Sequence, residues 1–244
     1  MAGIFQFPEL IQPANLLWDD NQWACEEKLT GYRCLFKLLG RNNKLSIYNR
    51  KFYGDNLRDI TNYFSYLNIK TDISETYIDA VLVSPETENK SYLGEIFQNG
   101  PLGAEKLMDL RGKAWMVFVD VLSYKNTDLL NMPYGERRVY LENIYHEIKI
   151  PNTYLVDMAG NNKKGFYDWL CINGGKGIIL KNKGAGYSNG NSRDFLEVVN
   201  LRGAKDNITL RNKDYRELLK IEDVKDTFDF DNFLALKALE NLEL

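Results

Sequence analysis

Histidine is almost absent from this chain of 244 residues: it has one, His146, beside three cysteines, Cys25, Cys34 and Cys171. With a single histidine, metal clusters built on histidine and catalysis by histidine are nearly ruled out. The cysteines are odd in number and lack metal-binding spacing, so they predict reduced thiols in a cytosolic setting. His146 falls on the expected exposed side of a helix, where a solvated surface role is the simplest interpretation.

Long apolar runs and excess charge of one sign are also missing. The longest hydrophobic stretches fall far short of the ~20 residues that a membrane helix needs. The first residues, MAGIFQFPEL, lack the basic start of a signal peptide. With 31 Lys+Arg against 34 Asp+Glu, the net charge of −3 argues against a broad basic field for nucleic acid, although a local basic groove is compatible with it. We therefore expect a cytoplasmic protein with no membrane partner.

What the sequence does contain is a mixture of short β-rich runs and helical patterns. Val-, Ile- and aromatic-rich runs bounded by polar or glycine residues predict strands. They lie at residues 32–39, 45–49, 77–84, 114–123, 174–182 and 195–201. The first two flank the polar turn GRNNK and should form a hairpin. Apolar residues at helical spacing predict helices at residues 57–68, 132–148 and 165–173. Residues 184–194 are rich in Gly, Asn and Ser and are expected to be a loop.

Together these patterns predict an α+β fold of largely antiparallel sheets flanked by helices. After residue 200 the pattern changes to a helical one with more acids than bases. We expect a main domain over residues 1–200 and a short helical C-terminal extension over residues 201–244.

Lys28 is the first candidate for chemistry. It lies between two apolar stretches and is followed by Gly31 and Arg33. A lysine that attacks a nucleotide phosphate must lose its proton, which requires partial burial or nearby cations. Glycine permits a tight approach, and the arginine fork suits phosphate or ribose. Alone, this K-x-x-G-x-R pattern is weak, and a surface lysine at the start of a strand is the better interpretation of it.

The segment EEKLTGYR resembles the K-x-D-G-x-R motif of ATP-dependent DNA ligases and of their relatives, the RNA ligases and mRNA capping enzymes. The resemblance continues in order through four more segments. These are residues 47–52 (S-R-N-G), 77–83 (D-G-E-L-V), 118–144 (F-D-(I/L)-L and P-x-x-E-R-R) and 175–199 (E-G-(I/V)-(V/M)-(L)-K and K-V-K). It implies a ligase-type nucleotidyltransferase core, similar to ATP-grasp proteins.

The resemblance also implies roles for particular residues. Lys28 stands where the family's lysine becomes covalently bound to AMP, which makes ATP the candidate nucleotide and a nicked duplex the candidate nucleic acid. Glu26 stands where the family helps to read the adenine amino group. The remaining residues that match the motifs are Gly31, Arg33, Arg50 and Lys181. For Arg50 and Lys181, a charged surface position at a strand end is the alternative interpretation.

Several motif positions depart from the family pattern. The family's residues are Asp, Glu, a stacking aromatic, a metal-binding Glu and the two phosphate-binding lysines. Here these positions hold Thr30, Val81, Val119, Lys176, Glu197 and Val199. Phe118 cannot replace the aromatic, because successive strand residues point to opposite faces.

The most consequential departures reverse charge. Lys176 in place of an acid disfavours Mg²⁺, which binds oxygen ligands, so we expect no metal site in this chain. Lys176 and Glu197 could pair with each other if their strands adjoin. Residues 200–244 are also too short for the five-stranded OB-fold that follows the core in family ligases.

Three hypotheses follow. The first is a ligase-like protein with eroded catalytic motifs that binds nucleic acid, nucleotide or protein. The second is a divergent but active polynucleotide ligase or nucleotidyltransferase that forms lysyl-AMP on Lys28, with Lys181 or Lys183 replacing the lost phosphate clamp. The third is a structural subunit whose segment 203–244 docks on a protein partner or fills the old cleft.

Overall fold

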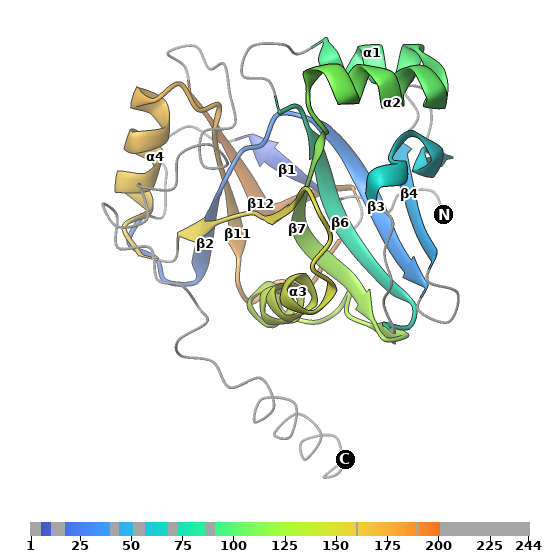
Figure 1. The fold of residues 1–244 in the computed structure, drawn as a ribbon. Coiled ribbons are helices and arrows are strands. Elements are labelled where there is room, and N and C mark those ends of the chain that lie inside the picture. Colours follow the sequence, from blue (N-terminus) through green and yellow to red (C-terminus); the bar gives the residue numbers. More distant parts are fainter. Residues whose placement is uncertain are drawn as a thin grey trace.

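The computed structural model describes residues 6–10, 18–39, 44–50, 57–67, 73–85, 91–159, 161–188 and 190–200. These residues form two sheets with helices around them (Figure 1). Segment 201–244, which was expected to be a helical extension, and the hairpin turn at residues 40–43 lie outside the described residues. No helix within the described ranges is long and apolar enough to cross a membrane.

The smaller sheet has the strand order β1-β12-β11-β2-β10. Its strands are β1 (Gln6–Leu10), β2 (Trp23–Glu27), β10 (Met158–Ala159), β11 (Gly177–Asn182) and β12 (Gly190–Val199). The pairs β12–β11, β11–β2 and β2–β10 are antiparallel, whereas β1 is parallel to β12. The sheet therefore joins the start of the chain to residues 177–199.

The larger sheet has the order β5-β4-β3-β6-β7-β8, with β9 parallel to β7. Its strands are β3 (Tyr32–Leu39), β4 (Lys44–Arg50), β5 (Leu57–Asp59), β6 (Thr76–Val83), β7 (Trp115–Tyr124), β8 (Thr127–Asp128) and β9 (Thr153–Leu155). The predicted strands at 32–39, 45–49, 77–84 and 114–123 are confirmed. β3 and β4 pair antiparallel, as the hairpin prediction requires.

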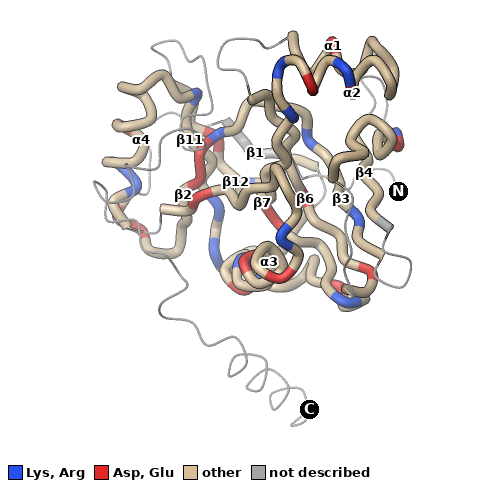
Figure 2. Tube along the Cα trace, in the orientation of Figure 1, with Lys and Arg blue, Asp and Glu red and all other residues tan. Residues whose placement is uncertain are grey.

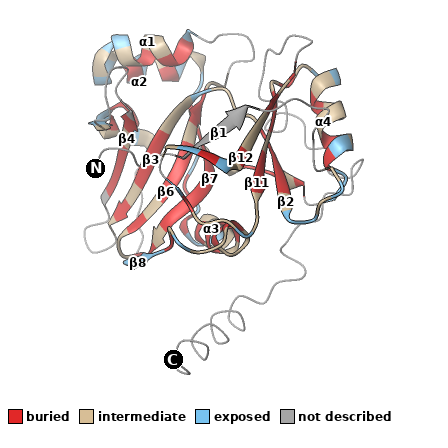
Figure 3. Ribbon diagram, turned by 180° about the vertical axis from the view of Figure 1, so that it is seen from behind, coloured by how far each residue is buried: buried red, intermediate tan, exposed pale blue. Residues whose placement is uncertain are grey.

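In the described ranges, four α-helices lie around the sheets: α1 (Tyr92–Gln98), α2 (Gly100–Arg111), α3 (Tyr134–Ile148) and α4 (Lys163–Ile172). α3 packs against β7, and α4 packs on β2 and β11 of the smaller sheet. Seen from behind, the strands are largely buried while exposed residues gather on the outer sides of α1, α2 and α4 (Figure 3). The helices predicted at 132–148 and 165–173 are confirmed, the second beginning two residues earlier.

The main core lies on one face of the larger sheet, beneath α1, α2 and α3. Phe36 and Phe118 are fully buried there, with ring centroids 5.2 Å apart. Tyr145 of α3 packs against the same cluster, and its ring centroid lies 6.4 Å from that of Phe118. Because strand residues alternate between faces, neighbours of Phe118 in β7 face the other sheet.

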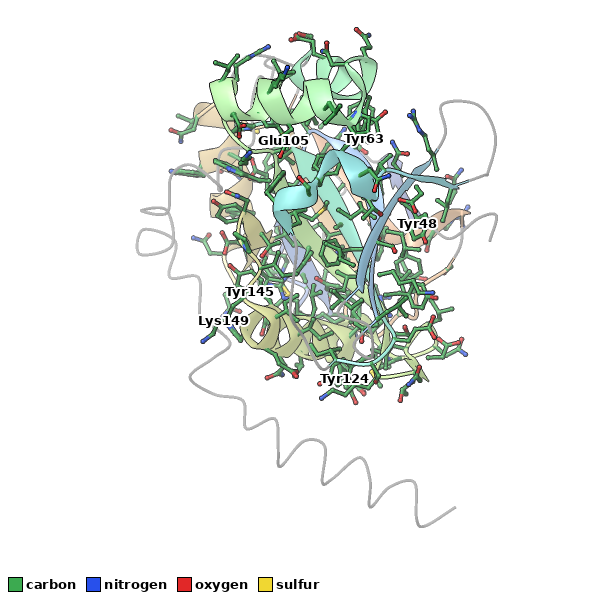
Figure 4. All side chains as sticks on the ribbon, turned by 45° about the vertical axis from the view of Figure 1, so that its right-hand side comes forward. Tyr48, Tyr63, Glu105, Tyr124, Tyr145 and Lys149 are labelled. Carbon is green, nitrogen blue, oxygen red and sulfur yellow. The ribbon has the colours of Figure 1, made fainter. Side chains whose placement is uncertain are left out.

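The helix predicted at 57–68 is wrong. The segment forms β5 and two short 3-10 helices, Thr61–Tyr63 and Ser65–Leu67. The Ile60 amide donates to the carbonyl of Ile47 at 2.9 Å, and Asp59 accepts from the Thr61 amide. The backbone amides of this segment therefore find hydrogen-bond partners without forming an α-helix. The helical spacing still identified residues that become buried, and Tyr63 packs among them (Figure 4).

The predicted loop at 184–194 is also partly wrong. β12 begins at Gly190, five residues before the predicted strand, and ends at Val199. Gly190, which has a φ of +83°, permits the chain to enter the strand from the loop. Pairing with the parallel β1 extends β12 through its polar first half, where the sequence has no alternating apolar signal.

Candidate functional site

A cleft of about 210 Å³ opens between the two sheets. Both sheets and the segment that joins β2 to β3 contribute to it. Its lining residues are Glu26, Glu27, Lys28, Leu29, Gly31, Arg33, Val81, Val119, Ile179, Lys181, Phe195 and Glu197. Acidic and basic positions lie close together along β2, β11 and β12 (Figure 2).

Lys28 directly follows β2 at this cleft. Its backbone amide donates to the carbonyl of Gly177 at 3.0 Å, which fixes the end of β2 against β11. Its side-chain Nζ forms an ion pair and hydrogen bond with Oε1 of Glu197 on β12. The two side chains are 27% and 21% exposed, so solvent and small molecules can reach the pair.

Gly31 lies in the β2–β3 connection, where the backbone comes close to β6. A Cβ added at this position would be 2.0 Å from the carbonyl oxygen of Leu82 and 2.8 Å from Cγ1 of Val81. Only glycine fits such an approach without moving backbone atoms. The residue therefore sets the path of the chain between Lys28 and Arg33.

Arg33 is held by a buried acid. Its guanidinium donates two hydrogen bonds to Asp79 of β6, and the Tyr187 hydroxyl donates to the same carboxylate at 2.8 Å. Burial alone would lower the pKa of Arg33, but the Asp79 carboxylate raises it above its usual value. Arg33 is thus a fixed cation on the cleft wall.

A second arginine–aspartate pair lies beside the first. Asp79 and Asp120 are direct partners in the β6–β7 register. Arg137 of α3 donates two bonds of 2.9 Å to Asp120 and a further one to the carbonyl of Ala185. Burial acts to lower the pKa of Arg137, and Asp120 raises it overall. These pairs connect α3 and the 183–188 loop to the larger sheet.

The floor of the cleft is a buried polar cluster around Glu26. Lys181 contacts Oε2 of Glu26 at 2.7 Å and donates to the carbonyl of Val119 at 2.8 Å. The Tyr134 hydroxyl donates to Oε1 of Glu26, and Arg138 lies 3.6 Å from the same oxygen. Burial, followed by the Glu26 charge, raises the pKa of Tyr134, so it stays a donor. Both oxygens of Glu26 are therefore engaged within the protein.

Five of the six site residues expected from the sequence line one cleft: Glu26, Lys28, Gly31, Arg33 and Lys181. The sixth, Arg50, ends β4 opposite Leu57 of β5, at the outer edge of the larger sheet. Its side chain lies outside the described residues. The roles of the six residues remain predictions, because lying close together in a cleft does not by itself assign a chemical role.

The altered motif positions also come together here. Val81 and Val119 line the cleft, whereas Phe118 lies in the core on the other face, as strand alternation predicts. Glu197 pairs with Lys28, although the sequence suggested Lys176. In the β11–β12 register Glu197 lies opposite Ile179, while the backbone of Lys176 meets Asn200. The register therefore decides the partner of Glu197.

Sequence reasoning missed three residues that shape the site. Asp79, Tyr134 and Arg138 were passed over, although each lies in a segment that matched a family motif. Their burial is the reason they matter, and a charge or hydroxyl in a strand or helix does not reveal its burial. The available signals in the sequence were the acid at Asp79, two residues before Val81, and the second arginine of the helix, Arg138.

The acids of the cleft do not fit a divalent metal. Among the described residues, no group of three or more His, Cys, Asp or Glu side chains is placed to hold a metal ion. Of the three glutamates that line the cleft, Glu26 and Glu197 are each bound to a lysine, and Glu27 is only 2% exposed. Asp79, which lies behind the lining, is bound to Arg33. A cation that needs several free carboxylate oxygens finds them occupied by ammonium and guanidinium groups.

Comparison with known proteins gives one consistent answer. Residues 11–197 match the family described as the ATP-dependent DNA ligase domain. DNA ligase 4 of Candida glabrata is 27% identical in an alignment 179 positions long, which covers 67% of this chain and 18% of that protein. The chain thus spans less than a fifth of the length of this relative.

Solved structures show the same fold at lower identity. A mycobacterial DNA ligase D complexed with ATP is 18% identical, with a TM-score of 0.57 over 79% of this chain and 60% of that chain. A Lig E DNA ligase is 16% identical, with a TM-score of 0.53 over 80% of this chain and 68% of that chain. The ATP-dependent DNA ligase of bacteriophage T7 in complex with ATP is 8% identical, with a TM-score of 0.51 over 81% of this chain and 68% of that chain. With most of its described length matched, the chain belongs to the ATP-dependent DNA ligase domain family.

Proposed function

We propose that this protein keeps the ligase adenylation fold as a binding module and does not carry out efficient nucleotidyl transfer. The observation that carries the proposal is the ion pair between Lys28 and Glu197. In the family pattern, the position of Glu197 holds a lysine that binds phosphate. Here a carboxylate stands in its place and holds the lysine that would act as nucleophile.

The pair opposes the reaction in two ways. Attack on the α-phosphorus needs the lone pair of a neutral amine, and an ammonium that donates to Glu197 has none. A phosphate brought to Lys28 would also face the Glu197 carboxylate. At about 4 Å and an effective dielectric of about 20, one like-charge contact costs about 4 kcal/mol. That corresponds to about three decades in rate.

The remaining parts of the cleft support the same proposal. Val81 and Val119 supply apolar surface where the family pattern has an acid and a stacking aromatic. Glu26 and Glu197 are each paired with a lysine of the cleft, and no group of three or more His, Cys, Asp or Glu side chains among the described residues is placed to hold a metal ion. Without a metal or uncompensated cations, charge that develops on a phosphate finds little stabilisation.

The proposed role is therefore binding. The candidate ligands are a nucleotide, nucleic acid such as a nicked duplex, or a protein partner, the last through residues 203–244. One ligase of similar fold is described as binding DNA with a minimal scaffold, which makes DNA a reasonable first ligand to test here.

A second candidate function is a divergent, active ligase or nucleotidyltransferase that forms lysyl-AMP on Lys28. One observation favours it: Lys28, Gly31 and Arg33 line the same cleft, and the Lys28 side chain is 27% exposed and within reach of a ligand. In this alternative the Lys28–Glu197 pair opens before reaction.

Intact-protein mass spectrometry separates the two. The purified chain is incubated with ATP and Mg²⁺ or Mn²⁺, with Lys28→Ala as control. The binding proposal expects no added AMP. An AMP adduct on the wild-type protein that is absent from Lys28→Ala overturns it in favour of the enzyme, and nicked DNA and RNA substrates then follow.

A further inference from the structure

Within the described part of the chain, each lysine or arginine that lines the cleft is paired with a carboxylate of the same protein. The three pairs are Lys28–Glu197, Arg33–Asp79 and Lys181–Glu26. A cleft that binds a polyphosphate normally offers cations or backbone amides whose charge is uncompensated. This cleft offers a set of internal ion pairs instead.

Of the three pairs, the one at Glu197 is the most open to a ligand. Lys181 and Glu26 are 4% and 3% exposed at their side chains, and Asp79 is fully buried. Lys28 and Glu197 are 27% and 21% exposed. Of the three paired carboxylates, Glu197 is therefore the one that a ligand in the cleft can reach. It lies beside Lys28, the lysine to which a phosphate would bind.

The walls of the cleft are apolar by contrast. Val81 and Val119 come from the larger sheet, and Ile179 and Phe195 come from the smaller one. Phe195 is buried beneath the Lys181 ammonium, which lies 5.1 Å from its ring. Such surfaces suit a flat, uncharged heterocycle, since apolar contact requires no charge on the ligand.

We propose that Glu197 makes this cleft select against phosphate, so that an uncharged nucleoside binds more tightly than the matching nucleoside triphosphate. The inference rests on the proposed function, in which the cleft binds without transferring a nucleotidyl group. It narrows the ligand class from nucleotides in general to the nucleoside portion. Glu197 is then the residue that determines specificity.

Isothermal titration calorimetry with adenosine, AMP and ATP, with and without Mg²⁺, tests this ranking. Wild-type protein should bind adenosine at least tenfold more tightly than ATP, a ratio that corresponds to about 1.4 kcal/mol or more in binding free energy. In Glu197→Gln, Lys28 loses its carboxylate partner and the affinity for ATP should rise at least about tenfold, while the affinity for adenosine changes by less than about twofold. Glu105→Gln, an exposed residue of α2 (Figure 4), should leave both affinities unchanged.

Two results overturn the inference. One is tighter binding of ATP than of adenosine by the wild-type protein. The other is the absence of binding by adenosine, guanosine, cytidine and uridine to a protein that circular dichroism shows to be folded. These failures are distinct from that of the proposed function, which falls if an AMP adduct forms on Lys28. An adduct together with preferred adenosine binding overturns the function alone.

Discussion

Asp79 and Asp120 lie directly opposite each other on β6 and β7, and each is neutralised by its own arginine. Two buried carboxylates so placed would repel each other strongly without partners. Arg33 reaches Asp79 from β3, and Arg137 reaches Asp120 from α3. The double pair therefore holds the cleft wall and α3 in place around one buried charge cluster.

Arg137→Met should destabilise the protein severely. Arg137 and Asp120 have fully buried side chains, so removing the arginine leaves a carboxylate without compensation in the interior. Breaking one partner of a buried pair costs about 3–5 kcal/mol. Urea unfolding measured by circular dichroism should show this loss in the free energy of unfolding.

The matched control is Lys164→Met. Lys164 pairs with Asp168 on the surface of α4, where the side chains are 60% and 49% exposed. Exposed pairs of this kind contribute less than about 1 kcal/mol. Equal losses in the two variants would contradict the structural role assigned to the Arg137–Asp120 pair.

Gly31→Ala should destabilise the fold by about 1–3 kcal/mol or more, the usual cost of forcing extra volume into packed structure. The added Cβ meets the Leu82 carbonyl oxygen at 2.0 Å, and that oxygen belongs to a central strand. Thermal unfolding checks the effect. Gly94→Ala in α1 is the control, since its Cβ meets nothing within 4 Å and helix propensity favours alanine by about 1 kcal/mol. A higher melting temperature for Gly31→Ala would refute the close approach.

The cysteines should react in a fixed order. Burial raises the pKa of Cys34 to about 12 and also raises that of Cys25, whereas Cys171 is partly exposed. At pH 8, Ellman's reagent should therefore label Cys171 first and the other two only on unfolding. Because the folded pKa of Cys34 is raised, its contribution to stability is complete below the ordinary thiol pKa of about 8.5 and falls as pH rises toward 12. Rapid labelling of all three thiols at pH 8 would contradict this burial.

The sequence predicted the central strands well because their patterns are local. β3, β6 and β7 are apolar runs whose bounds follow from composition, and α3 follows from its helical spacing and proline start. Five of the residues that match the family motifs line one cleft, since motif order carries the three-dimensional arrangement, and their roles there stay predictions.

What the sequence could not provide depends on pairing between distant segments. The partner of Glu197 is set by the β11–β12 register and by the end of β2, 169 residues away from Glu197 along the chain. The helix expected at residues 57–68 failed because β4 pairs with the segment and replaces its helical hydrogen bonds. The buried roles of Tyr134 and Arg138 likewise arise only once the fold brings these side chains of α3 to Glu26 of β2.

Restoring the family residues should restore chemistry if Lys28 is limited only by its surroundings. The full set is Thr30→Asp, Val81→Glu, Val119→Phe, Lys176→Glu, Glu197→Lys and Val199→Lys. The change at Glu197 removes the acid that holds Lys28, and the new acids offer oxygen ligands for Mg²⁺. We expect an AMP adduct to form about three decades faster than in the wild type, as the charge contact at Glu197 alone corresponds to about 4 kcal/mol.

The time course of adduct mass after mixing with ATP and Mg²⁺ measures this gain. Lys28→Ala in the restored background should abolish the adduct, which identifies the site of attachment. A variant restored at Glu197 alone should gain less, because two ammonium groups then share the cleft without a metal or phosphate clamp. If the wild type already forms the adduct as fast as the restored protein, the altered positions do not limit catalysis, and the Lys28–Glu197 pair opens readily during turnover.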